Sequence, residues 1–205
     1  MTFAVLPAGG LSRRMGRPKL ALPLGDATVL EQVIRTLRRA EVATVLVVLG
    51  PHVAELSGLA IAAGAEVSVL PVATPDMRAT IEHGLHWLEQ HHQPQPDDDW
   101  LLVPADHPTL SVEVVRTLRA ARECHAERSI FIPTFEGRRG HPALVAWRHV
   151  AGMRQLPIGL GLNVFFRQQT EVTLEVPVAS AAVLADLDTP EDYERLLHDW
   201  RPINL

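Results

Sequence analysis

The chain has 205 residues, 47% of them hydrophobic and 21% charged, which is the composition of a globular protein with enough apolar side chains for a core. This composition excludes a disordered chain, and the single cysteine, Cys124, excludes an internal disulfide and a multi-cysteine metal site. The formal net charge of −5 argues against a general nucleic-acid binder. The longest apolar run, 42–49, is far shorter than the ~20 residues that cross a bilayer. We therefore expect a cytoplasmic protein that does not bind membranes.

Apolar periodicity predicts strands that alternate with helices along the chain. Strands are expected at 3–6, 44–49, 66–72, 100–103, 129–133, 143–146 and 171–176. Helices are expected at 28–40, 53–63, 76–90, 112–122 and 190–200. The polar, proline-broken segment 91–99 is expected to be a surface loop whose acids, Asp97, Asp98 and Asp99, are solvated.

This alternation predicts an α/β protein with a mostly parallel sheet and helices on both faces. Neither a linker nor an internal repeat divides the sequence, so we expect one domain over residues 1–205. In such folds ligands bind beyond the carboxyl ends of the strands. The first predicted strand runs into Gly9-Gly10, and the fourth runs towards Asp106. We expect the functional site at these two strand ends.

The loop after the first strand has the chemistry of an anion site. It reads LPAGGLSRRMGRPK from Leu6 to Lys19 and combines glycines with three cations, Arg13, Arg14 and Lys19. Glycines let backbone N–H groups approach a phosphate closely. A basic surface turn is the alternative interpretation. The loop is neither the G-x-G-x-x-G dinucleotide fingerprint nor a Walker A loop, which argues against a dehydrogenase and a P-loop enzyme.

Carboxylates that suit a metal ion occur in two places. Asp106 follows a predicted buried strand, and Asp186 and Asp188 lie one residue apart in the sequence DLDTP. Such oxygens suit Mg²⁺, which proteins often bind through one or two carboxylates and substrate phosphates. At the second place Asp188 or Thr189 could instead be the N-cap of the last predicted helix.

The segment 137–142, with the sequence GRRGHP, is another concentration of polar groups. Two arginines and a histidine between glycines can form an anion platform. A tight basic turn between two strands explains the same residues equally well.

The segment 6–19 resembles the signature loop of the MobA-like nucleotidyltransferases, aliphatic-A-G/A-G-x-S-x-R-M-G-x-x-K. The matching residues are Ala8, Gly9, Gly10, Ser12, Arg14, Met15, Gly16 and Lys19. The resemblance implies a three-layer, Rossmann-like nucleotidyltransferase fold. It also implies that the loop wraps the triphosphate of a nucleotide, with Arg14 and Lys19 on the phosphates and Arg13 as a weaker candidate.

Two acidic segments resemble the metal-binding elements of the same family. The sequence PADHP is similar to the C/A-D-x-P element, and DLDTPEDY is similar to D-I-D-T-P-E-D near the family's C-terminus. The resemblance implies a Mg²⁺ cofactor held by Asp106 first and Asp188 second, with Asp186 as the remaining candidate. Arg14, Lys19 and Asp106 are then the catalytic residues.

Two further segments bear on the substrates. GRRGHP resembles the G-x-R-G-H-P element of the molybdenum cofactor cytidylyltransferase branch, which implies that Arg139, Gly140 and His141 face the acceptor. The segment 77–85 falls at that branch's S-S/T-I/L-x-x-G-L helix start, which adds Arg78 and Thr80, although Ala79 departs from the pattern.

The implied reaction transfers CMP from CTP to a molybdopterin-type acceptor, and a molybdoenzyme of the xanthine dehydrogenase type is a possible partner. Gly9 is instead typical of the guanylyltransferase branch, so GTP stays an alternative nucleotide. The sequence also allows a nucleotide-binding accessory protein, or a transferase for a different phosphorylated acceptor such as a sugar phosphate.

Overall fold

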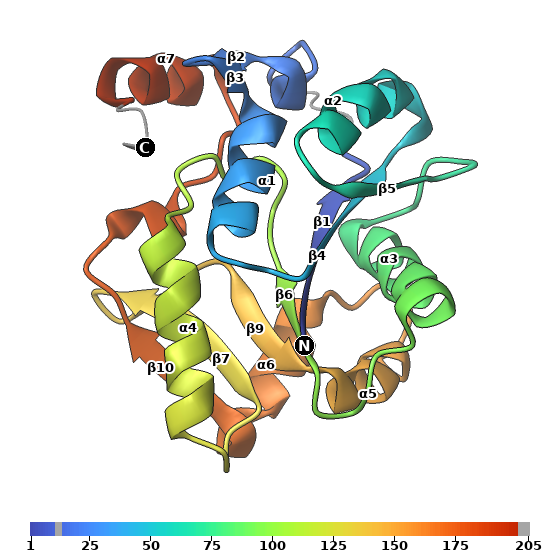
Figure 1. Cartoon of the computed structure of the whole chain (residues 1–205), viewed down its shortest axis with the longest axis vertical. Coiled ribbons are helices and arrows are strands. Elements are labelled where there is room, and N and C mark those ends of the chain that lie inside the picture. The colour runs from blue at the N-terminus through green and yellow to red at the C-terminus, as the bar shows by residue number, and fades with distance from the viewer. Residues whose placement is uncertain (11–13, 201–205) are drawn as a thin grey trace.

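The computed structural model describes residues 1–10 and 14–200, and a mostly parallel sheet lies between two layers of helices (Figure 1). The main strands follow the order β10-β7-β9-β6-β1-β4-β5 across the sheet. Their bounds are Thr2–Ala8 for β1, Thr44–Leu49 for β4, Glu66–Val69 for β5, Asp99–Leu102 for β6, Ile130–Phe135 for β7, Ala143–Ala146 for β9 and Thr173–Pro177 for β10. Strand β9 is antiparallel to both of its neighbours, β6 and β7. The predicted three-layer α/β/α fold is confirmed.

Each face of the sheet has its own layer of helices and its own hydrophobic cluster. One layer comprises α1 (Val29–Arg39), α2 (Ser57–Ala62), α4 (Val112–Cys124) and α7 (Pro190–Asp199). The other comprises α3 (Met77–His92), α5 (Val150–Arg154) and α6 (Leu162–Gln168). None of the described helices has both the length and the hydropathy that a bilayer span needs.

Shorter elements connect these layers. Two small strand pairs are β2 (Pro23–Leu24) with β3 (Ala27–Thr28), and β8 (Arg138–Arg139) with the end of β7. Short 3₁₀ helices cover Lys19–Ala21, Pro51–Leu56, Trp147–His149, Thr170–Val172 and Ala181–Leu184.

The central strands and the first helix form for reasons visible in the sequence. Strand β4 is buried at every position, which matches its unbroken apolar and β-branched run, because a parallel strand between two helix layers is covered on both faces. Helix α1 begins at a capping box, in which Glu31 N donates to Thr28 Oγ1 at 3.3 Å and Thr28 N donates to Glu31 Oε2 at 2.8 Å.

The structure corrects several predicted elements. The helix expected at 53–63 is instead a 3₁₀ helix, Pro51–Leu56, followed by α2, and Val53 inside the 3₁₀ helix has a non-helical φ of −129°. Helices α5 and α6 have no counterpart among the predicted elements. The acids of 97–99 are not a solvated run: Asp98 pairs with the N-terminal ammonium group, and Asp99 begins β6 and lies 3.1 Å from Arg122.

The sheet brings three separate segments to one edge. Strands β1 and β6 are parallel neighbours, so Gly9 and Asp106 follow their strands at the same edge of the sheet. Strand β9 runs the opposite way and pairs Ala143 with Leu102, so the preceding His141 lies at this edge too. The fold therefore gathers the glycine loop, the first predicted metal ligand and the GHP segment at one place.

Candidate active site

Lys19 lies at the centre of a cluster of charged groups beyond the ends of β1 and β6. Its ammonium group pairs with Asp106 Oδ2 and lies 3.1 Å from Asp188 Oδ1. Arg14 Nη2 lies 2.9 Å from the other oxygen of Asp188. Two cations and two carboxylates, predicted from three distant segments, therefore meet at one point.

Burial and the neighbouring charges shift the pKa of Lys19 in opposite directions. Its side chain is only 15% exposed, and this burial by itself lowers the pKa of the ammonium group. The neighbouring charges of Asp106 and Asp188 outweigh burial and raise the pKa above its ordinary value. Lys19 is therefore a fixed positive charge at neutral pH.

Backbone contacts fix Asp188 beside Asp106. Leu187 N donates to the backbone oxygen of Asp106 at 3.3 Å, and Lys19 Nζ donates to the backbone oxygen of Leu187 at 2.8 Å. The N-cap of helix α7 is Thr189, whose Oγ1 accepts from Asp192 N at 3.2 Å. The carboxylate of Asp188 is thus directed to the two cations and does not cap the helix.

Asp186 occupies a different environment from Asp188. Its Oδ1 lies 3.9 Å from His107 Nδ1. Burial, followed by the charge of Asp106, raises the pKa of the Asp186 carboxyl group. Within the part of the chain that the structure describes, Asp188 is the member of this pair that contacts Lys19 and Arg14.

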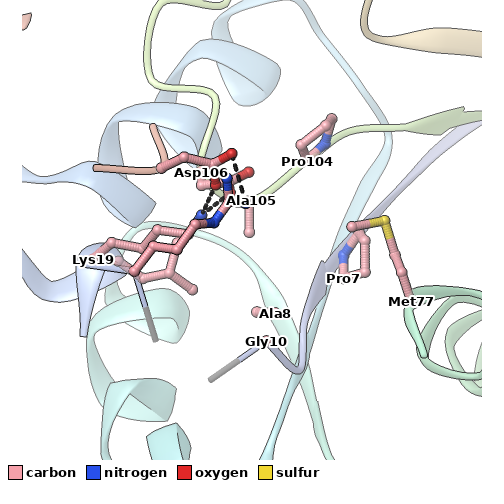
Figure 2. A pocket seen from close by; sticks show the side chains of 11 residues that line it. Pro7, Ala8, Gly10, Lys19, Met77, Pro104, Ala105 and Asp106 are labelled. Carbon is pink, nitrogen blue, oxygen red and sulfur yellow. Dashed lines mark hydrogen bonds and ion pairs between the residues drawn. The ribbon is translucent and has the colours of Figure 1, made fainter. Parts of the chain in front are cut away.

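A pocket of about 280 Å³ opens beside this charged cluster (Figure 2). Lys19 and Asp106 meet on one side of the pocket, and Met77 lies beside Pro7 on the other. The full lining is Pro7, Ala8, Gly10, Arg14, Lys19, Leu20, Met77, Pro104, Ala105, Asp106 and Asp188. Two predicted phosphate-binding cations, Arg14 and Lys19, therefore share one pocket with two of the three predicted metal ligands, Asp106 and Asp188.

A second pocket of about 300 Å³ continues the cleft and shares Pro7, Gly10 and Met77 with the first. It adds Gly9, Thr74, Pro75, Asp76 and Thr80. No sequence motif singles out Thr74, although it follows β5, whose carboxyl end lies at the same edge as that of β1. Gly9 and Thr80 pack so closely that a Cβ on Gly9 would lie 2.9 Å from Thr80 Oγ1.

The segment GRRGHP is both a tight turn and part of the site. Glu136 and Gly137 have positive φ angles and join β7 to β8, where Arg139 Nε lies 2.8 Å from Glu175 Oε1. A Cβ on Gly140 would overlap the backbone oxygen of Val183, which also accepts a 2.8 Å hydrogen bond from His141 N. His141 lies close enough to Asp186 and Asp106 to interact with their charges, whereas Arg139 pairs with Glu175.

Two buried histidines, His107 and His141, lie near the acids and are neutral. Burial, followed by the nearby His141, lowers the pKa of His107 to about 4, and its side chain is 1% exposed. Burial also lowers the pKa of His141, against the opposing charges of Asp186 and Asp106. Both rings are therefore uncharged at neutral pH. His107 was not among the predicted site residues; its place directly after Asp106 was the available clue.

The remaining predicted residues have different positions. Met15 is buried, and Gly16 has a φ of +69°, which favours glycine. The side chain of Arg78 is 11% exposed and pairs with Glu82. Ser12 and Arg13 lie outside the described residues, so their assignment to the nucleotide stays a prediction.

The donor set fits a hard divalent cation. Asp106 and Asp188 offer two carboxylates in one pocket, and Mg²⁺ commonly uses one or two carboxylates together with substrate phosphates. Among the described residues, no cluster of three or more His, Cys, Asp or Glu side chains forms a complete metal cage. A metal at this place would complete its coordination with water or with phosphate oxygens of a substrate.

The chain is similar to known proteins both in sequence and in fold. The chain is 28% identical to a molybdenum cofactor guanylyltransferase of Rhizobium meliloti (strain 1021), over 97% of this chain and 91% of the relative. It is 23% identical to a molybdenum cofactor cytidylyltransferase of Escherichia coli (strain K12), over 92% of each. The solved structure of a nucleotidyl transferase from Methanothermobacter thermautotroptrophicus has the same fold, with a TM-score of 0.77, 22% identity and coverage of 97% of this chain and 96% of that one. The family model "MobA-like NTP transferase domain" matches residues 4–172, and the chain therefore belongs to this family and is a nucleotidyltransferase.

Proposed function

We propose that the protein transfers CMP from CTP to the terminal phosphate of a molybdopterin-type acceptor and releases pyrophosphate. The observation that carries the proposal is the meeting of Arg14, Lys19, Asp106 and Asp188 in one pocket beside the glycine loop. Two similar proteins that act on the molybdenum cofactor support the class of acceptor. The reaction would take place in the cytoplasm, with a molybdoenzyme of the xanthine dehydrogenase type as the recipient of the product.

The chemical step is an in-line displacement at phosphorus. An oxygen of the acceptor phosphate forms a bond to the α-phosphorus of CTP, and the bond from that phosphorus to the β-phosphate oxygen breaks. Pyrophosphate leaves with the bonding electron pair. The attacking phosphate is already ionised, so the protein needs no general base for this step.

The side chains of the pocket supply position and charge, which are the main requirements of phosphoryl-type transfer. Lys19 and Arg14 would neutralise the charge that develops on the leaving pyrophosphate. Asp106 and Asp188 would hold Mg²⁺. When bound, the ion supplies Lewis-acid stabilisation of phosphate oxygens.

His141 would contact the acceptor from the side of the cleft that carries the acids. His141 is uncharged and close to Asp106, so it suits a hydrogen bond with a neutral heterocycle better than an ion pair with phosphate. Gly140 holds its position against Val183. Arg139, Arg78 and Thr80 remain proposed contributors, of which Thr80 lines the cleft directly.

GTP is the second candidate nucleotide, and the packing of Gly9 against Thr80 favours it. Gly9 is the residue typical of guanylyltransferases, and it leaves room for Thr80 at the base of the second pocket. The guanylyltransferase of Rhizobium meliloti is also more similar to this chain than the cytidylyltransferase of Escherichia coli, at 28% against 23% identity. The GHP segment supports CTP.

A thermal-shift titration with Mg²⁺ and each of CTP, GTP, ATP and UTP tests the nucleotide assignment, because a ligand that binds only the folded state raises the melting temperature. A selective shift with CTP is the expected result. A selective shift with GTP would assign the protein to the guanylyltransferases, and no shift with any nucleotide would contradict an enzyme that binds a nucleoside triphosphate.

A further inference from the structure

Arg78 lies near the start of helix α3, and all three of its guanidinium nitrogens form hydrogen bonds within the protein. Its Nε lies 2.7 Å from Glu82 Oε1, one turn along the helix. Its two terminal nitrogens donate to four backbone oxygens of one segment, those of Arg154, Leu156, Pro157 and Leu160, at 2.9–3.5 Å. A phosphate could reach this group only if these bonds were broken, because the side chain is 11% exposed.

The segment 154–160 begins at the last residue of α5 and is bound to α3 through Arg78 and Glu89. At its start, Arg154 makes two hydrogen bonds to Glu89, with Nη1 3.0 Å from Oε1 and Nη2 2.9 Å from Oε2. Glu89 and Arg78 are eleven positions apart on α3, which is ~16 Å along a helix axis. Arg78 therefore contacts the backbone of the segment from Arg154 to Leu160, whereas Glu89 binds only the side chain of Arg154 in that segment.

Exposed apolar side chains occur on both elements that Arg78 joins. Met77, next to Arg78, is exposed and lines both pockets of the cleft. Ile158 and Leu160 lie in the turn that Arg78 holds, where Leu160 N donates to Pro157 O at 3.2 Å, and both side chains are exposed. Exposed apolar side chains that form one contiguous patch are typical of ligand-binding grooves and other contact surfaces.

We propose that Arg78 is a positioning residue for the acceptor: it holds the turn 157–160 beside Met77, so that this apolar edge packs against the ring system of the acceptor. Arg78 then acts through the turn and not by touching the acceptor's phosphate. The inference rests on the proposed function, since it assigns one part of the acceptor site.

An arginine is needed for this geometry. A planar guanidinium can donate to several carbonyl oxygens at once, whereas a lysine ammonium is a compact point charge on a flexible stem. In Arg78→Gln the turn loses most of its anchor, and in Arg78→Lys it keeps part of it. Glu89→Gln is the matched control, because it weakens the second link between α3 and this segment, away from the cleft.

The test measures pyrophosphate release with Mg²⁺, the preferred nucleotide and molybdopterin, together with hydrogen exchange of the backbone amides of 155–161. For Arg78→Gln we expect faster exchange in this segment and a KM for the acceptor raised about tenfold, with the Kd of the nucleotide within about twofold of wild type. For Arg78→Lys we expect an exchange rate and an acceptor KM between those of the wild type and Arg78→Gln. Glu89→Gln should keep the wild-type KM for the acceptor.

Two results would overturn the inference. One is an unchanged acceptor KM in Arg78→Gln while exchange in the segment increases. The second is an equal loss of nucleotide and acceptor binding, which would indicate a general structural role. If the wild-type protein released no pyrophosphate, the proposed function itself would fail and this inference with it, which is a different result from a variant that behaves as wild type.

Discussion

Lys19 bridges two acids that are far apart along the chain. It pairs with Asp106 and Asp188, and Arg14 adds a second cation to Asp188. The two cations offset the electrostatic repulsion between the two carboxylates. In the proposed bound state, a Mg²⁺-nucleotide complex would bring its own cation to the acids, and its phosphates would pair with Lys19 and Arg14.

Asp188 and Asp186 provide a paired test of this arrangement. Asp188→Asn removes the charge that faces Lys19 and Arg14, so we expect Mg²⁺-dependent nucleotide affinity to fall by about tenfold or more. Asp186→Asn should change that affinity by less than about threefold, because Asp186 faces His107. Isothermal titration of both variants measures the difference. The reverse order of effects would assign the metal to Asp186.

His107 makes stability depend on pH. Its pKa is about 4 in the folded protein and ~6.5 in an unfolded chain, so the unfolded state binds the proton more tightly. The free energy of unfolding therefore decreases as the pH falls from ~6.5 towards 4. Lowering the pH from 7.5 to 5 should therefore reduce the wild type's free energy of unfolding by about 2 kcal/mol through this group. Urea unfolding of wild type and His107→Gln at both pH values should show a smaller loss in the variant. Equal losses would contradict a neutral, buried His107.

The position of helix α3 depends on a close approach to the sheet. A Cβ on Gly84 would lie 2.8 Å from Val48 Cγ2 and 2.9 Å from Val5 Cγ1, both in the central strands. The glycine therefore lets α3, which carries Met77, Arg78 and Thr80, lie close against β1 and β4.

Gly84→Ala tests this packing. Alanine in a helix normally stabilises by about 1 kcal/mol relative to glycine, but here we expect a loss of about 1–3 kcal/mol because the methyl group overpacks the core. Gly58→Ala in α2 is the control, since a Cβ there meets no atom within 4 Å and should stabilise slightly. Denaturant unfolding measures both. A stabilised Gly84→Ala variant would contradict the close packing of α3.

The central elements could be predicted from local sequence, whereas the helices after β9 could not. Strands β1 and β4 are unbroken apolar runs, and α1 begins with a Thr-x-x-Glu capping box. Helix α6 has no side-chain N-cap, and its Phe165 and Phe166 are buried in the hydrophobic cluster that α3 and α5 share. It forms through tertiary packing, which a single sequence does not display.

The same division holds within the site. The motif around Arg14 and Lys19 and the strand end before Asp106 pointed to the pocket. The choice between Asp188 and Asp186 depends on the bond from Leu187 N to Asp106 O, between residues far apart in sequence. The contacts of Arg78 with 154–160 are also long-range, so no local pattern could reveal them.

At the scale of the whole molecule, the site exists because parallel strands end together. Strands β1 and β6 deliver Gly9 and Asp106, and the antiparallel β9 begins at the same edge beside His141. The segment before α7 then returns Asp188 to this edge. The residues proposed to bind phosphate, metal and acceptor are thus adjacent although they are spread over most of the chain.

Pyrophosphate release is the most direct test of the central claim, nucleotidyl transfer to a molybdopterin-type acceptor. We expect release only when Mg²⁺, CTP and molybdopterin are all present, and a rate at least about a hundredfold lower in Asp106→Asn, which loses a charge beside Lys19. Nucleotide binding without pyrophosphate release under these conditions would contradict the claim and would instead indicate a nucleotide-binding accessory protein.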